Sequence, residues 1–152
     1  MFYFGYGSNM SPAQMTERCG IWEFVSVASL AGYRLAFVRY STAWGGGTCG
    51  LVKDDTKVVW GVVYDLSEEA IAKLDAWEGA PRSHYREPAL VKLASDEEPV
   101  YAETYFVTRF SATENLPTKR YMDRILEGAR HWGLPADYIR FLDAIPTREM
   151  VR

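Results

Sequence analysis

Hydrophobic and polar positions follow different patterns in the two parts of this chain. Up to residue 107, short runs rich in β-branched and aromatic side chains alternate with glycine, acidic and proline turns, which predicts strands. The opening strand ends at Gly5, and the later expected strands cover residues 24–30, 33–40, 49–53, 57–66, 85–93 and 100–107. The first two thirds of the chain therefore read as mostly β-structure.

Helical spacing or helix end signals mark four other stretches. Ser11, Pro12 and Gln14 supply an N-cap, a first-turn proline and a capping-box glutamine for a helix over residues 11–19. A second helix runs from Ser67 to Gly79 with an apolar stripe at Ile71, Leu74 and Trp77. Two helices close the chain, with stripes at Met122, Ile125, Leu126, Ala129 and Trp132, and at Tyr138, Phe141, Leu142 and Ile145.

This order of elements predicts the fold class. Strands come first and helices last, and no repeat, low-complexity tract or linker interrupts the 152 residues. We expect one α+β domain over residues 1–152, built on a small, largely antiparallel β-barrel of about six or seven strands with flanking helices. A hydrophobic content of 48% is enough for a packed core. The later aromatic residues expected in that core are Tyr101, Tyr105, Phe106, Tyr138 and Phe141.

Composition narrows the functional classes. Cys19 and Cys49 form no Cys-x-x-Cys pair, and His84 and His131 lie beside no acidic cluster, so we expect no metal. A net charge of −3 without a basic run argues against a nucleic-acid partner. The chain contains no stretch of membrane-spanning length and no signal-peptide pattern, so we expect a cytoplasmic protein without a membrane contact.

The N-terminal strand runs directly into a turn of small residues. Gly5 and Gly7 allow the main chain to approach a ligand closely, and Ser8 and Asn9 can hydrogen bond either to a ligand or to the turn. Backbone N–H groups in such a turn suit a small anion such as a carboxylate. The same sequence also fits a plain turn, so this feature alone leaves both interpretations open.

A carboxylate on an apolar helix face is the second candidate feature. Glu78 lies seven residues after Ile71, which places it within about 20° of that core-facing residue. Desolvation and the helix C-terminus both disfavour the charged form there, which suits a general base. The alternatives are a solvated helix end paired with Arg82 or Arg86, or a carboxylate pair with Asp75.

A nucleophile–base pair of Ser8 and His84 is disfavoured by the sequence. The Gly-x-Ser-x-Gly motif is absent, and no third residue is marked as an orienting group. Phosphate-loop and dinucleotide-binding motifs are missing as well. The sequence therefore favours chemistry that needs neither an enzymic nucleophile nor a nucleotide.

Five weak motifs in a fixed order resemble the γ-glutamylcyclotransferases, which have the AIG2-like fold. They are the Tyr6-Gly7-Ser8-Asn9 turn, the strand over residues 60–66, the Glu78-Gly79 corner followed by Tyr85, Leu116-Pro117-Thr118-x-x-Tyr121 before Gly128-Ala129, and Gly133-Leu134-Pro135-x-x-Tyr138. The match covers nearly the whole chain. The family more often has serine at position 118 and leucine at position 10.

The resemblance implies a cofactor-independent enzyme that converts γ-glutamyl amino acids or related compounds to 5-oxoproline and a released amine. It assigns proton acceptance to Glu78, pocket completion to Tyr121, and substrate binding to the loop Tyr3, Phe4, Gly5, Tyr6, Gly7, Ser8 and Asn9. The loops around residues 45–47 and 82–84 are expected to shape specificity.

Two alternative functions stay open at this point. One is a γ-glutamylamine cyclotransferase that acts on γ-glutamyl-lysine isopeptides, and the other is a non-catalytic small-molecule binding module on the same fold. The expected partner is a small γ-glutamyl compound. No pattern in the sequence fixes an interface, so both a monomer and a homodimer remain open.

Overall fold

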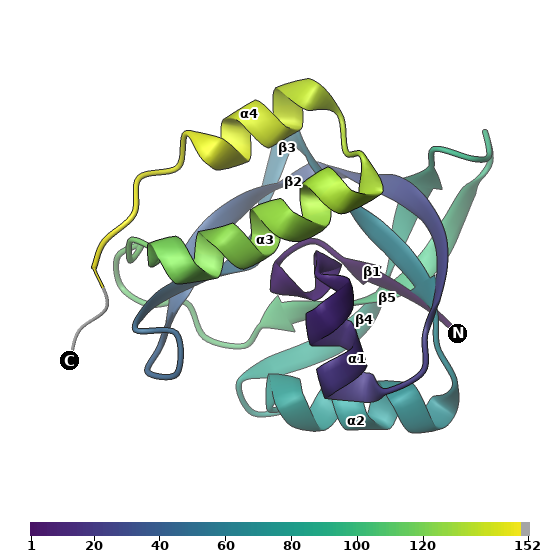
Figure 1. Cartoon of the computed structure of the whole chain (residues 1–152), viewed down its shortest axis with the longest axis horizontal. Helices are drawn as coiled ribbons and strands as arrows, with labels where there is room; N and C mark the ends of the chain where they lie inside the picture. The colour runs from purple at the N-terminus through teal and green to yellow at the C-terminus, as the bar shows by residue number, and fades with distance from the viewer. Residues whose placement is uncertain (150–152) are drawn as a thin grey trace.

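A closed β-barrel forms the centre of the computed structural model, which describes residues 1–149 (Figure 1). The strands of this described part are β1 (Phe2–Gly5), β2 (Glu23–Ser41), β3 (Gly46–Asp65), β4 (His84–Leu93) and β5 (Pro99–Val107). Their order around the barrel is β1-β3-β2-β4-β5. Neighbouring strands are antiparallel except β1 and β5, which close the barrel through a parallel pairing at Tyr3 and Glu103.

The predicted α+β barrel is confirmed, but it has five strands in residues 1–149 instead of six or seven. The difference arises because four of the expected strands merge into β2 and β3. Ala31 pairs with Val58 and Tyr33 pairs with Lys53, so residues 54–57 bulge out opposite Gly32. The glycine and acidic residues that were taken as strand ends therefore form an irregularity inside one long antiparallel pair.

Helices pack around the barrel at the positions that their end signals predict. They are the short 3-10 helix η1 (Ser8–Met10) and the α-helices α1 (Pro12–Cys19), α2 (Glu68–Glu78), α3 (Lys119–Trp132) and α4 (Ala136–Asp143). Ser11, Ser67 and Thr118 each cap a helix, because their hydroxyl oxygens accept a backbone N–H from the first turn. Gly79 and Gly133 end α2 and α3 in the left-handed conformation that glycine adopts without strain.

The capping box predicted for Gln14 is only half formed. Ser11 Oγ accepts the Gln14 N–H as expected. The Gln14 side chain instead donates to Ser8 Oγ at 2.6 Å and to Asn9 Oδ1 at 3.0 Å. This side chain therefore holds the preceding turn, not the start of its own helix.

The core fills the barrel and the space beneath the helices. Phe4, Met10, Tyr64, Leu74 and Ile125 are among its fully buried side chains. Close approach of the backbones requires Gly128, since a Cβ there would overlap the main chain of Met10 in η1. Three expectations were wrong: Trp77, Tyr101 and Phe141 lie at the surface, with 55%, 69% and 48% of their area exposed.

The last two helices lie on one side of the barrel, above η1 and α1, and α2 lies on the opposite side (Figure 1). Within residues 1–149, α3 packs against η1, and α1 packs against α2. None of the helices described here has the length and hydropathy needed to cross a membrane. The arrangement brings the end of α2 and the turn after β1 to the same face of the barrel.

Candidate active site

A pocket of about 590 Å³ opens where the turn after β1 meets the end of α2. The β2–β3 hairpin contributes a second side, and β5 and α3 contribute aromatic side chains. We call residues 6–9 the pocket floor, and residues 39–44 together with Ser83 the pocket rim. The floor and the rim are far apart in sequence, so the barrel closure brings them together.

The backbone of the floor is exposed to the pocket because glycine is present at position 7. A Cβ on Gly7 would lie 2.7 Å from Cys49 Sγ, so no larger residue fits without movement. Among the hydrogen bonds of residues 1–149, none uses the backbone N–H groups of Gly7, Ser8 and Asn9. All three of these residues line the pocket, so their N–H groups are candidate donors to a bound group.

Asn9 connects the floor to the end of α2 through its side-chain amide. Its Nδ2 donates to Tyr3 Oη at 2.8 Å and to Glu78 Oε1 at 3.0 Å. Its Oδ1 accepts from Gln14 Nε2 and, at 3.1 Å, from Arg18 Nη1. All the hydrogen-bonding positions of this amide are therefore used inside the protein, which fixes the direction in which the amide points.

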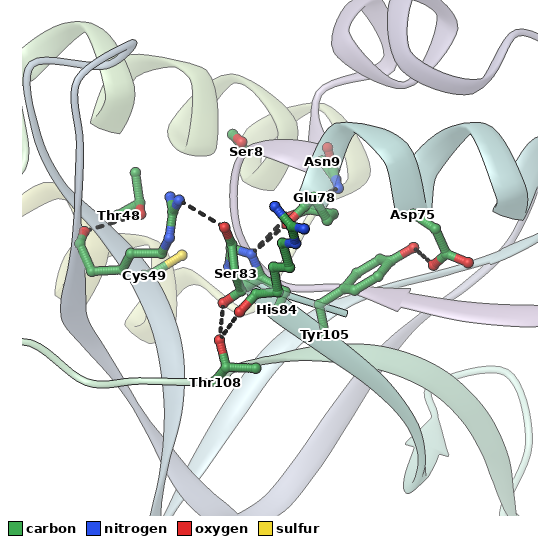
Figure 2. Close-up of polar contacts among 12 residues, drawn as sticks. Ser8, Asn9, Thr48, Cys49, Asp75, Glu78, Ser83, His84, Tyr105 and Thr108 are labelled. Carbon is green, nitrogen blue, oxygen red and sulfur yellow. Dashed lines mark hydrogen bonds and ion pairs between the residues drawn. The ribbon is translucent and has the colours of Figure 1, made fainter. Parts of the chain in front are cut away.

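Glu78 is the last residue of α2 and points from the helix end into the pocket (Figure 2). Its side chain is 16% exposed, and its Oε1 lies 3.4 Å from Arg18 Nη1. His84 Nδ1 lies 2.8 Å from the main-chain oxygen of Glu78, and it must donate there because a carbonyl oxygen only accepts. The corner formed by Gly79 and the cis Ala80–Pro81 bond returns the chain to His84.

Glu78 faces the interior as predicted, but its surroundings are more polar than the sequence indicated. Asn9 and Arg18 donate to the carboxylate, and both donors stabilise the anionic form against burial. The expected alternative partners are wrong: Arg86 pairs with Asp75 at 2.9 Å, and no ion pair joins Arg82 to Glu78 within residues 1–149. Asp75 is consequently tied to Arg86 and not paired with Glu78.

Ser8 and His84 both line the pocket, yet they do not form a nucleophile–base pair. Ser8 Oγ accepts from Gln14 Nε2, and His84 is bound to the Glu78 main chain. No hydrogen bond connects the two side chains in the described part of the chain. The sequence-based argument against this pair agrees with the geometry.

Buried tyrosines form the inner wall of the pocket. Burial raises the pKa of Tyr3, Tyr6 and Tyr121 well above the ordinary value, so these phenols are neutral hydrogen-bonding groups. Tyr105 Oη donates to Asp75 Oδ1 at 2.6 Å, and burial raises its pKa as well. Figure 2 shows Tyr105 extending from the pocket toward Asp75.

Cys49 belongs to the same wall. Its thiol lies 3.0 Å from Tyr121 Oη, and its backbone N–H donates to that oxygen at 3.1 Å. Burial raises the pKa of this thiol to about 12, so it remains protonated at neutral pH. Cys49 therefore acts here as a small packing residue against Gly7.

Most of the residues predicted for the site come together in this pocket. Those that line it are Tyr3, Tyr6, Gly7, Ser8, Asn9, Glu78 and Tyr121. Phe4 and Gly5 do not line it, because they lie in β1 and Phe4 is fully buried in the core. Their assignment to substrate contact is not supported by the geometry, and the roles of the other residues stay predictions.

Sequence reasoning missed several polar residues of the pocket, among them Arg18, Arg39 and Tyr105. Arg18 is one helical turn beyond Gln14, so the helical period could have placed both on the same face. Arg39 follows an irregularity in the pairing of β2 with β3, and no local signal marks it; Tyr105 was expected only as a core aromatic. Within residues 1–149, His, Cys, Asp and Glu side chains form no cluster of three that could hold a metal ion.

Comparisons with known proteins place this geometry in a family. A γ-glutamylcyclotransferase from Bos taurus is 28% identical over 147 residues, covering 94% of this chain and 77% of the bovine protein. A solved γ-glutamyl cyclotransferase structure superposes with a TM-score of 0.93 at 25% identity, over 100% of this chain and 91% of that one. An uncharacterized Homo sapiens protein superposes with a TM-score of 0.91 at 26% identity, over 99% and 90%.

The AIG2-like family model matches residues 58–142, which is more than half of the chain. The matched segment contains the second part of β3 and all of α2, including the end where Glu78 lies. The order of the motifs in the sequence, the barrel fold and the similar proteins all indicate the same family. The chain therefore belongs to the AIG2-like/γ-glutamylcyclotransferase family.

Proposed function

We propose that this protein is a γ-glutamylcyclotransferase, which closes the glutamyl part of a γ-glutamyl compound into 5-oxoproline and releases the amine. The observation that carries the proposal is the placement of Glu78 Oε1 3.0 Å from Asn9 Nδ2. This contact sets a carboxylate beside a turn whose backbone N–H groups line the same pocket. Family membership supports the same reaction.

The substrate supplies its own nucleophile in this reaction. The α-amine of the glutamyl unit attacks its own γ-carbonyl carbon and closes a five-membered ring. Intramolecular reactions of this kind reach very high effective concentrations when the reacting atoms are held in place. The protein therefore needs to fold the substrate, move protons and stabilise the developing oxyanion.

Glu78 is the proton-transfer group in this scheme. Its carboxylate takes one proton from the α-ammonium, and the free amine then forms the new C–N bond, which leaves two hydrogens on the ring nitrogen. When the tetrahedral intermediate collapses, the bond to the leaving nitrogen breaks and Glu78 returns the first proton to that nitrogen. The ring nitrogen then loses its second proton to the released amine, so the products are 5-oxoproline and an ammonium group. The hydrogen bonds from Asn9 and Arg18 stabilise the anionic carboxylate before the reaction and fix its direction.

The pocket floor is the anion-binding part of the site. The N–H groups of Gly7, Ser8 and Asn9 have no acceptor among residues 1–149, so they can donate to the α-carboxylate or to the developing oxyanion. The neutral phenols of Tyr6 and Tyr121 add polar groups and ring faces without adding charge. The substrate is thereby bent around Glu78.

The direct test is to incubate the protein with γ-glutamyl amino acids and γ-glutamyl amines and to measure 5-oxoproline and released amine together. The proposal predicts equal amounts of the two products without added metal or cofactor. Binding of 5-oxoproline without turnover of any compound in the panel would contradict it. That result would favour the non-catalytic binding module.

A further inference from the structure

The pocket contains an arginine that the ring-closing scheme does not use. Arg39 lies in β2 and lines the rim, where its Nη2 donates to Ser83 Oγ at 3.2 Å. Arg18, on the other side of the pocket, has the carboxylate of Glu78 as its partner. In the described part of the chain, by contrast, Arg39 forms an ion pair with no carboxylate. A half-buried guanidinium with only a hydroxyl as its partner can still bind an anion.

The charges of the pocket lining fit a substrate with a second carboxylate. The lining carries two guanidinium groups, of Arg18 and Arg39, and one carboxylate, of Glu78. The γ-glutamyl unit brings one carboxylate and one ammonium group, which leaves one positive charge of the pocket uncompensated. A leaving amine that bears its own carboxylate would compensate it, whereas a simple alkyl amine would not.

The position of Arg39 relative to Glu78 supports this assignment. Ser83 N donates to Gly79 O at 2.9 Å, so Ser83 lies beside the corner that directly follows Glu78. Figure 2 shows Ser83 next to His84, which contacts the main chain of Glu78. Arg39 is therefore tied to the loop that directly follows Glu78, and both residues line the same pocket.

We propose, on the basis of the proposed function, that Arg39 binds the carboxylate of the leaving amine and is held in position by Ser83. This contact makes γ-glutamyl amino acids the substrate class, since their α-carboxylate is one carbon from the scissile amide nitrogen. γ-Glutamyl amines without that carboxylate are then poor substrates. Arg39 is thus a specificity-determining residue and takes no part in the bond changes.

Two substrates that differ only in this carboxylate test the proposal: γ-glutamyl-alanine and γ-glutamyl-ethylamide. For Arg39→Gln we expect a rise in KM for γ-glutamyl-alanine of about 10- to 100-fold. The kinetics of the ethylamide should stay within about twofold. Arg39→Lys keeps the charge and should retain part of the preference for γ-glutamyl-alanine.

The matched control is Arg34→Gln in the same strand, because Arg34 pairs with Glu114 and does not line the pocket. This variant should behave as the unmodified protein on both substrates. An equal loss on both substrates in Arg39→Gln would overturn the proposal. It would indicate that Arg39 only ties the hairpin to Ser83.

Calorimetric binding in a Glu78→Gln background separates this proposal from the proposed function, because the ligand is not consumed. If no 5-oxoproline forms with any substrate but γ-glutamyl-alanine binding is weakened by Arg39→Gln, the carboxylate site stands and the proposed activity fails. If turnover occurs and neither KM nor binding of γ-glutamyl-alanine depends on Arg39, the activity stands and the carboxylate site fails. If there is neither turnover nor a dependence on Arg39, both fail.

Discussion

The floor and the rim of the pocket differ in how their polar groups are satisfied. On the floor, the side chain of Asn9 has partners in Tyr3, Gln14, Arg18 and Glu78, and the backbone N–H groups stay available. On the rim, the guanidinium group of Arg39 donates to the neutral hydroxyl of Ser83, and Arg39 also lines the pocket. The floor is therefore organised by the protein itself, whereas the rim can adapt to the group that binds there.

This difference explains how one fold could keep its chemistry and change its substrate. Under the proposed function, the preorganised carboxylate and turn would serve the glutamyl unit, which is the same in every substrate. The rim would contact the variable leaving group, so a single substitution there would change specificity without moving Glu78. Disturbing the floor should cost stability and turnover together, while disturbing the rim should mainly change the choice of substrate.

The largest stability effect is expected for Asn9→Ala on the floor. The substitution leaves the buried phenol of Tyr3 and the carboxylate of Glu78 without their amide donor. We expect a loss of about 2–4 kcal/mol in the free energy of unfolding, measured by urea denaturation. Asn115→Ala is the control, because that amide contacts only the nearby Ser111 and Thr113, and it should cost less than about 1 kcal/mol.

A smaller effect on the floor should follow from Gly7→Ala. The new methyl group would press on Cys49 Sγ, and overpacking of this kind costs about 1–3 kcal/mol. Adding Cys49→Ala removes the sulfur, so the double variant should be more stable than Gly7→Ala alone. If the losses of thermal stability in Gly7→Ala and Cys49→Ala simply add in the double variant, the contact between the new methyl group and Cys49 Sγ is not the cause of the loss.

Alkaline pH should weaken the fold through the same thiol. Burial raises the pKa of Cys49 to about 12 in the folded protein, against about 8.5 for an exposed thiol. The folded state then binds more protons, so stability falls as the pH rises above about 8.5 and continues to fall toward 12. Cys49→Ala should remove about 1–2 kcal/mol of the loss between pH 8 and pH 10 in urea denaturation. An unchanged slope would argue against a neutral buried thiol.

The smallest stability effect is expected on the rim. Arg39→Gln gives up one partly exposed hydrogen bond to Ser83, so the free energy of unfolding should change by less than about 1 kcal/mol. The same denaturation series as for Asn9→Ala measures it. A loss as large as that of the floor variant would remove the distinction between the two regions.

The ends of the helices were predicted well from the sequence, because a helix cap acts only on its neighbouring residues. Ser11, Ser67 and Thr118 cap helices, and Gly79 and Gly133 end them. The number of strands was overestimated, since a glycine turn and a bulge have the same composition. Only the pairing of Ala31 with Val58 and of Tyr33 with Lys53 separates the two cases.

Pocket residues could be predicted where the residue type is tied to the local backbone geometry. They were missed where their position depends on long-range packing. Glu78 and the Gly7 turn could be found from helical spacing and from turn chemistry. Arg39 could not, because its partner Ser83 is 44 residues away along the chain, whereas the helical period could have placed Arg18 beside Gln14. Phe4 was included because it is adjacent in sequence to the floor, but it is fully buried and does not line the pocket.

Turnover of γ-glutamyl-alanine by Glu78→Gln is the decisive measurement of whether the Glu78 carboxylate transfers the proton during ring closure. The variant keeps the shape of the side chain and removes the base, so 5-oxoproline formation should fall by about 10²- to 10⁴-fold. Glu69→Gln, on the exposed face of the same helix, should leave the rate unchanged. Near-native turnover by Glu78→Gln would show that this carboxylate is not the proton acceptor.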